Sequence, residues 1–216
     1  MLTVGLVAEG THDYLMLEPF IRRELSKREI DDITFKFLQP YQDATGSMSG
    51  GGWPRVVAWC KTHSGTGLET FFTPLFAGDP ECDVIIIHVD GDALEMLVPH
   101  TAVQISIPVP DKVTRVDTLV AAIEDFLNAP TSCRSKIALA LPVLHTEAWI
   151  LAAENYPQDP CTIDAKAEFR NSYDFTQTRL ADYYRQKVAA ATGSNWTDPA
   201  CYSYSKFSSE VGGLDL

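Results

Sequence analysis

A run of aliphatic residues that ends in two carboxylates is the feature that most constrains how this chain can fold. Residues 84–89 read Val-Ile-Ile-Ile-His-Val, and Asp90, Gly91 and Asp92 follow directly. Such a short aliphatic run is typical of a strand buried on both faces of a parallel sheet. Open α/β sheets bind ligands outside the carboxyl ends of their strands. We therefore expect an α/β fold with a site at Asp90 and Asp92, although Asp-Gly is also common in solvated turns.

A second carboxylate follows an apolar run at the start of the chain. Residues 2–8 read as a short buried strand, and Glu9 comes directly after it. We expect Glu9 at the same edge of the sheet as Asp90 and Asp92. Carboxylate oxygens suit a hard cation such as Mg²⁺. These three acids predict a site for one or two Mg²⁺ or Mn²⁺ ions.

The rest of the chain alternates strand and helix patterns. Thr11 is the expected N-cap of the first helix, and Asp13 would lie in its first turn, where the helix dipole favours negative charge. Apolar spacing defines the other elements. It predicts strands over 33–38 and 136–143, an edge or extended segment over 103–109, and helices over 14–27, 53–63, 69–76, 93–98, 114–128, 145–155 and 176–192. The expected architecture is a mainly parallel sheet with helices on both faces over residues 1–155. A C-terminal extension rich in Pro, Asp, Tyr and Ser, residues 156–216, is expected to pack on it.

Several other residues are candidates for supporting roles. His145 and Glu147 follow another expected strand, and His145 would support the site or carry a proton, although a structural turn histidine is the commoner case. Lys206 would reach a substrate phosphate, or else belong to a tail packed on the domain. Residues 50–52 are three glycines before a helix, which could cradle a phosphate. Their spacing matches neither the P-loop nor the dinucleotide motif, and a plain loop is the simpler interpretation.

This pattern resembles the TOPRIM domain, which topoisomerases, primases, ribonuclease M5-type nucleases and OLD-family nucleases share. The resemblance rests on Glu9-Gly10 after the first strand and on Asp90-x-Asp92 after a later one, and it covers residues 1–155. Residues 147–152, Glu-Ala-Trp-Ile-Leu-Ala, are similar to a Glu-x-Trp-x-Leu-Ala element of small stand-alone TOPRIM-like proteins. Those proteins are often encoded beside an ATPase.

The resemblance implies a metal-dependent nuclease that hydrolyses phosphodiester bonds in nucleic acid. Asp90 and Asp92 would hold metal, Glu9 would ligate a second ion or act as general acid or base, and Glu147 would complete the site. The resemblance also implies an ATPase partner subunit and a role in phage defence or DNA maintenance. Two alternatives stay open: a nucleotidyl- or glycosyltransferase that holds a metal–nucleotide diphosphate on the Asp-x-Asp, and a non-catalytic subunit whose acidic edge docks on a partner.

The charge argues against tight binding of nucleic acid by this protein alone. Seventeen Lys and Arg residues against 29 Asp and Glu residues give a net charge of −12. An acidic surface of this kind repels a polyanion, so binding would be local or would need a more basic partner.

The five cysteines form no CxxC pair, which favours reduced thiols over a disulfide framework or a zinc site. Reduced thiols lead us to expect a cytoplasmic protein, and no stretch approaches the roughly 20 apolar residues of a membrane helix.

Overall fold

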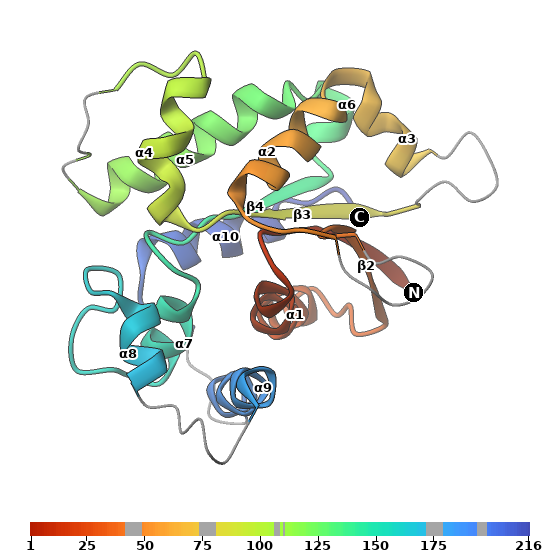
Figure 1. The fold of residues 1–216 in the computed structure, drawn as a ribbon. Coiled ribbons are helices and arrows are strands. Elements are labelled where there is room, and N and C mark those ends of the chain that lie inside the picture. The colour runs from red at the N-terminus through yellow and green to blue at the C-terminus, as the bar shows by residue number, and fades with distance from the viewer. Residues whose placement is uncertain (42–48, 74–80, 106–108, 110, 172–178, 194–197) are drawn as a thin grey trace.

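Four parallel strands form a sheet at the centre of the molecule, with helices on both faces (Figure 1). The computed structural model describes residues 1–41, 49–73, 81–105, 109, 111–171, 179–193 and 198–216. The strands are β1 (Leu2–Val7), β2 (Ile33–Gln39), β3 (Val84–His88) and β4 (Ile137–Ala140). Their order across the sheet is β2-β1-β3-β4. The predicted α/β class is confirmed, and the arrangement is consistent with a Rossmann-like fold.

Alternating side chains of the strands pack into two separate cores. In β3, Val84 and Ile86 belong to the core on one face of the sheet, and Ile85 and Ile87 belong to the core on the other. All residues of β3 are buried, as the aliphatic run predicts for a strand with neighbours on both sides and helices above and below. We refer to these as the first and the second face.

The helices divide between the same two faces (Figure 1). The first face carries α1 (Thr11–Ser26), α7 (Glu147–Ala153), α8 (Ala165–Asn171), α9 (Leu180–Ala191) and α10 (Tyr202–Gly212). The second face carries α2 (Trp53–Thr62), α3 (Glu69–Phe72), α4 (Leu94–Leu97), α5 (Lys112–Leu127) and α6 (Thr131–Arg134). Short 3-10 turns are η1 (Gly65–Leu68), η2 (Gly91–Ala93) and η3 (Val98–His100). Among the residues that the structure describes, no helix is both long and apolar enough to cross a bilayer.

The direction in which the chain moves across the sheet reverses between β1 and β3. From β1 the chain passes through α1 to β2 on one side, whereas from β3 it passes through α5 to β4 on the other side. Crossovers of the same hand that run in opposite directions place their helices on opposite faces, as α1 and α5 are here. The carboxyl ends of β1 and β3 therefore flank the switch point, where open α/β sheets form a crevice for ligands.

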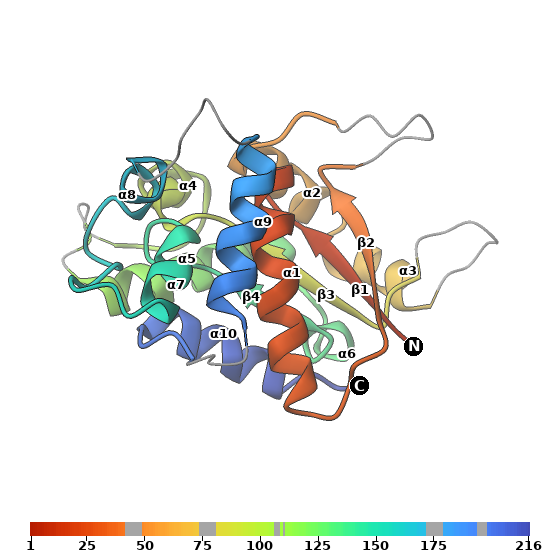
Figure 2. The same ribbon diagram turned by 90° about the horizontal axis from the view of Figure 1, so that it is seen from below.

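Residues of the C-terminal extension complete the core on the first face. Helix α9 lies beside α1 along much of its length (Figure 2). Tyr204 and Phe207 of α10 pack against Phe20 and Trp149, with ring centroids between 5.2 and 5.5 Å apart. The Tyr204 hydroxyl donates a hydrogen bond to the buried Glu24 carboxylate at 2.5 Å. The extension thus buries apolar surface of the sheet and of α1.

The expectation of a single helix in this extension was wrong. Helices α8 and α10 are also present, and α9 begins at Leu180, while the expected residues 176–178 lie outside the described part of the chain. Serine and glycine make the sequence of α10 a weak helix former. The helix is stabilised by Tyr204, Phe207 and Val211, which lie on one face and are buried.

Smaller differences concern the ends of elements. Gly10, not Thr11, is the N-cap of α1, and its N–H donates to Asp13 Oδ2 at 2.7 Å. The expected segment 103–109 forms no strand in its described residues, and residues 106–108 lie outside them. Residues 74–76, the expected end of another helix, are likewise outside the described ranges.

Candidate metal site at the carboxyl edge of the sheet

Glu9 and Asp90 meet because β1 and β3 are neighbours in the sheet. Val7 pairs with Ile87, so the residues that follow the two strands leave the sheet side by side. Glu9 Oε1 accepts a hydrogen bond from the Asp90 backbone N–H at 2.8 Å. The structure therefore brings together two of the acids that the sequence proposed for the site, through a backbone contact that holds the Glu9 side chain in place.

One oxygen of Asp90 is held by protein groups and the other faces the site. Oδ1 accepts hydrogen bonds from the Thr146 backbone N–H and hydroxyl, both at 3.1 Å. Oδ2 lies 3.7 Å from His145 Nδ1 and 3.6 Å from Lys166 Nζ. Burial alone would raise the pKa of Asp90, but the nearby imidazoles of His145 and His88 and the charge of Lys166 hold it well below its usual value. Asp90 is thus an ionised carboxylate with one oxygen available for a ligand.

Asp90, Asp92 and His145 form the group of side chains that could hold a metal ion. One donor atom from each lies within 4.8 Å of the others. His145 Nδ1 is 3.7 Å from Asp90 Oδ2 and 3.7 Å from Asp92 Oδ2, and it is buried without a hydrogen-bond partner. The Asp92 side chain is 51% exposed, so the cluster opens to solvent on one side. Two carboxylates and an imidazole nitrogen without a partner are a suitable donor set for a divalent cation.

A second group of charged residues lies behind Asp90, on the side of α1. His88 is fully buried, with Nδ1 at 3.9 Å from Asp13 Oδ2 and Nε2 at 3.4 Å from Asp90 Oδ1. Burial would lower the pKa of His88, but hydrogen bonding to Asp90 and the charges of Asp13 and Glu9 raise it to about 9. Burial raises the pKa of Glu9 to about 7 and also raises the pKa of Asp13. The buried imidazolium thus offsets part of the negative charge of the acids.

Glu147 lies deeper, at the start of α7. Its side chain is 1% exposed, and Oε1 accepts a hydrogen bond from the Tyr184 hydroxyl at 2.7 Å. Its Oε2 is buried with no hydrogen-bond partner. The charge of Glu147 acts on both Asp13 and Lys166, which places it in the same electrostatic environment as the site.

Two basic residues next to the acids had no signal in the sequence. Lys166 lies on α8, in the extension, and its ammonium group reaches Asp90 from there. Arg115 on α5 donates to the Gly91 carbonyl at 2.6 Å and forms an ion pair with Glu95. Their spacing from the acids along the chain is long, so only the folded chain shows that they belong to the site.

Glycines allow the close backbone contacts at this edge. A Cβ on Gly91 would lie 2.0 Å from Val143 O, so the Asp-Gly-Asp turn can approach the loop after β4 only with glycine there. A Cβ on Gly51 would lie 2.0 Å from Glu9 O, which accepts a hydrogen bond from the Gly52 N–H at 2.6 Å. The glycine run before α2 therefore packs directly against the backbone of Glu9, and Gly52 has the positive φ of 93° that favours glycine.

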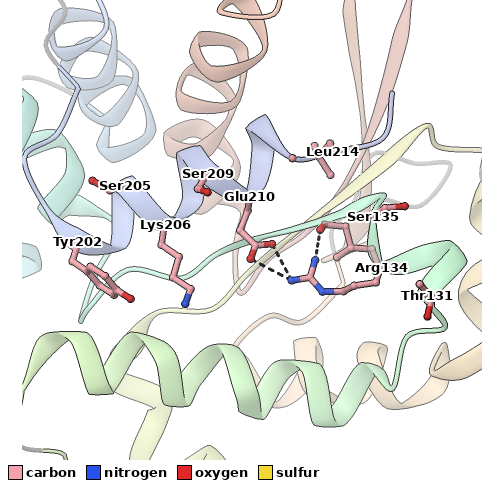
Figure 3. Close-up of a pocket in the computed structure, with 11 residues that line it drawn as sticks. Thr131, Arg134, Ser135, Tyr202, Ser205, Lys206, Ser209, Glu210 and Leu214 are labelled. Atoms are coloured by element: carbon pink, nitrogen blue, oxygen red, sulfur yellow. Dashed lines mark hydrogen bonds and ion pairs between the residues drawn. The ribbon is translucent and has the colours of Figure 1, made fainter.

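Lys206 lies elsewhere, on α10, in a groove lined by residues of α10, of α6 and of the start of β4 (Figure 3). Its ammonium group pairs with Asp117 of α5 at 2.6 Å. The groove has a volume of about 720 Å³, and it also contains Arg134, which pairs with Glu210 at 3.0 Å. The structure gives Lys206 this structural partner and does not bring it to the acidic cluster.

Comparison of the chain with protein-family models, with curated proteins and with solved structures gives no match. The function is therefore inferred from the chemistry of the site.

Proposed function

We propose that this protein is a divalent-metal-dependent phosphodiesterase that cleaves nucleic acid, with a TOPRIM-like arrangement of its acidic residues. The observation that carries the proposal is the cluster of Asp90, Asp92 and His145, whose donor atoms lie within 4.8 Å of one another. Glu9 lies next to this cluster, at the switch point of the sheet. A divalent ion bound there supplies Lewis acidity and neutralises charge that develops on the phosphoryl group.

Three residues around the cluster support this proposal. Thr146 holds Oδ1 of Asp90, whereas Oδ2 lies next to His145 and Lys166. Lys166, whose ammonium is 3.6 Å from Oδ2, is a compact positive charge that would bind a non-bridging phosphate oxygen. Glu9 is proposed as the general acid or base, because a pKa raised to about 7 suits proton transfer near neutral pH. Its Oε1 is engaged by the Asp90 N–H, so the proton would be carried on Oε2.

The substrate is proposed to bind weakly unless a partner contributes. A net charge of −12 opposes the approach of a polyanion. Lys166 is one local cation, and a duplex or single strand needs phosphate contacts along its length. We therefore include in the proposal a more basic partner, for which an ATPase subunit of a defence or DNA-maintenance complex is the candidate.

A cleavage assay tests this function. Labelled single- and double-stranded DNA and RNA are incubated with the full-length protein at low salt, with Mg²⁺, Mn²⁺ or EDTA. We expect metal-dependent cleavage that falls by orders of magnitude in Asp90→Asn and in Glu9→Gln. The matched control is Asp31→Asn, which changes an exposed aspartate just before β2, at the opposite edge of the sheet. Its rate should equal that of the wild type.

Two results would count against the proposal. Cleavage that survives in both Asp90→Asn and Glu9→Gln would place the activity of the preparation outside this site. Absence of cleavage under all conditions, together with tight metal-dependent binding of a nucleoside diphosphate, would favour the transferase alternative.

A further inference from the structure

The buried hydroxyl of Thr146 lies between the His88 imidazole and the Asp90 carboxylate. Thr146 is the N-cap of α7, its exposed fraction is 0%, and it directly follows His145 in the chain. Its backbone N–H and its hydroxyl both donate to Oδ1 of Asp90 at 3.1 Å. On the other side, Thr146 Oγ1 lies 2.6 Å from Nε2 of His88, the last residue of β3. Thr146 thus links a buried imidazole to a carboxylate of the site.

The directions of these hydrogen bonds follow from the number of protons available. A threonine hydroxyl has one proton to donate and two lone pairs that can accept. Because that proton is directed to Asp90 Oδ1, the contact with His88 forms only if Nε2 carries a proton and donates it to Thr146 Oγ1. His88 Nε2 is also 3.4 Å from Asp90 Oδ1, so its N–H adds positive charge on the same side of the carboxylate. His88 therefore orients the Thr146 hydroxyl toward Asp90.

The donors of Thr146 occupy one oxygen of Asp90 and leave the other for a ligand. A carboxylate oxygen accepts about two hydrogen bonds, and Thr146 fills both positions on Oδ1. Oδ2 instead lies 3.7 Å from His145 Nδ1, next to the other candidate metal ligands. Asp90 is therefore arranged to bind a cation through one oxygen and not through both.

We propose that Thr146, held by His88, is a positioning residue that makes Asp90 a monodentate ligand and so selects Mg²⁺ or Mn²⁺ over Ca²⁺. This inference rests on the proposed function, because it requires the metal site at Asp90. Ca²⁺ takes roughly six to eight oxygen ligands and can bind both oxygens of a carboxylate, whereas Mg²⁺ requires an octahedral arrangement with few carboxylates and several waters. Mn²⁺ takes the same octahedral form. A carboxylate that is held in the monodentate form offers the larger ion one oxygen fewer.

Titration calorimetry of the full-length protein with Mn²⁺ and with Ca²⁺ tests the proposal. The wild type should bind Mn²⁺ more tightly than Ca²⁺. Thr146→Val keeps the shape of the side chain and the backbone N–H but removes the hydroxyl. We expect its Mn²⁺ affinity to fall by about tenfold, which is the lower end of the effect of losing a group that orients a metal ligand. The Ca²⁺ affinity should be equal to that of the wild type or higher, because Oδ1 becomes available as a second oxygen.

Two further variants separate the role of the hydroxyl from a general disturbance of the fold. Thr146→Ser returns the hydroxyl and should restore the wild-type ratio of the two affinities. Thr118→Val is the matched control, because it removes another buried threonine hydroxyl, which donates to Thr114 O on α5 at 2.6 Å. It should leave both affinities unchanged. An equal loss of Mn²⁺ and Ca²⁺ affinity in Thr146→Val would overturn the proposal, and so would failure of Thr146→Ser to restore the ratio.

Nuclear magnetic resonance of the metal-free wild type, labelled with ¹⁵N-histidine, needs no substitution. Nε2 of His88 should carry a proton that is hydrogen-bonded and slow to exchange with water. An unprotonated Nε2 would overturn the proposal, because the Thr146 hydroxyl would then have to donate to His88 instead of Asp90.

The calorimetry also distinguishes failure of this inference from failure of the proposed function. A wild type that binds no Mn²⁺ would overturn both, because the metal site itself would be absent. Tight Mn²⁺ binding by the wild type, with an unchanged ratio of affinities in Thr146→Val, would overturn this inference alone.

Discussion

Replacement of Gly91 by alanine tests how the turn that carries Asp90 and Asp92 is held. A Cβ at position 91 would lie 2.0 Å from Val143 O, 2.5 Å from Pro142 O and 2.6 Å from the Val143 carbonyl carbon. These are backbone atoms, so a change of side-chain rotamer cannot relieve the overlap. The turn and the loop after β4 must move apart by about 1.5 Å to reach an ordinary contact distance.

The contacts on both sides of the turn resist that movement. The Asp92 N–H donates to Leu144 O at 3.2 Å, and Arg115 donates to Gly91 O at 2.6 Å. Overpacking in a rigid region typically costs 1–3 kcal/mol, and here we expect the upper end, about 3 kcal/mol of unfolding free energy. That loss corresponds to a fall in melting temperature of about 9 °C for a chain of this size. The metal affinity should also fall, because His145 follows the displaced loop while Asp90 and Asp92 move with the turn.

Urea denaturation of Gly91→Ala beside Gly212→Ala gives the comparison. A Cβ on Gly212, at the end of α10, meets no atom within 4 Å, so this control should be neutral or more stable by up to about 1 kcal/mol. Metal binding by the two variants is measured by titration calorimetry. A free energy of unfolding for Gly91→Ala within about 1 kcal/mol of the wild type would refute the reasoning, because the two backbones would then separate at little cost.

Three further predictions concern the same edge of the sheet. At about 100 times its dissociation constant, Mn²⁺ should stabilise the native state by about 2.7 kcal/mol, and Asp90→Asn combined with Asp92→Asn should abolish the shift in a thermal melt. Because burial raises the pKa of Glu9 from 4.5 to about 7, the folded state binds its proton more tightly, and stability is lost as the pH rises through that window. Glu9→Gln, which keeps an acceptor oxygen, should therefore be more stable than the wild type above pH 7 by up to about 3 kcal/mol, and a difference independent of pH between 4.5 and 7 would contradict this. Arg115→Met removes a donor to Gly91 O, so it should lower the free energy of unfolding by about 1–3 kcal/mol and weaken metal binding. Unchanged metal affinity in calorimetry would show that the arginine does not position the turn.

The sequence alone was sufficient for the class of fold and for the meeting of Glu9 with Asp90. The aliphatic run of β3 is a local pattern, and a strand that is apolar on both faces requires helices above and below it. Parallel strands end at the same edge of a sheet, so acids that follow two neighbouring strands must lie close together. The helix over 114–128 was also found, within two residues at each end, because its apolar face is continuous.

Other features depended on contacts that local patterns do not report. Helix α10 has a sequence of low helix propensity and forms because Tyr204 and Phe207 are buried against α1 and α7. His145 was a supporting candidate only, and its place between Asp90 and Asp92 depends on how closely the loop after β4 approaches Gly91.

The tertiary structure by itself decided which distant residues join the site. Lys166 reaches Asp90 because the extension folds back over the first face. Lys206, which the sequence offered as a ligand for phosphate, pairs with Asp117 instead because α10 lies along α5. Hydrophobic periodicity determines which face of a helix is buried. The partner of that face depends on the packing of the whole chain. The same packing determines which charged side chains of different helices come into contact.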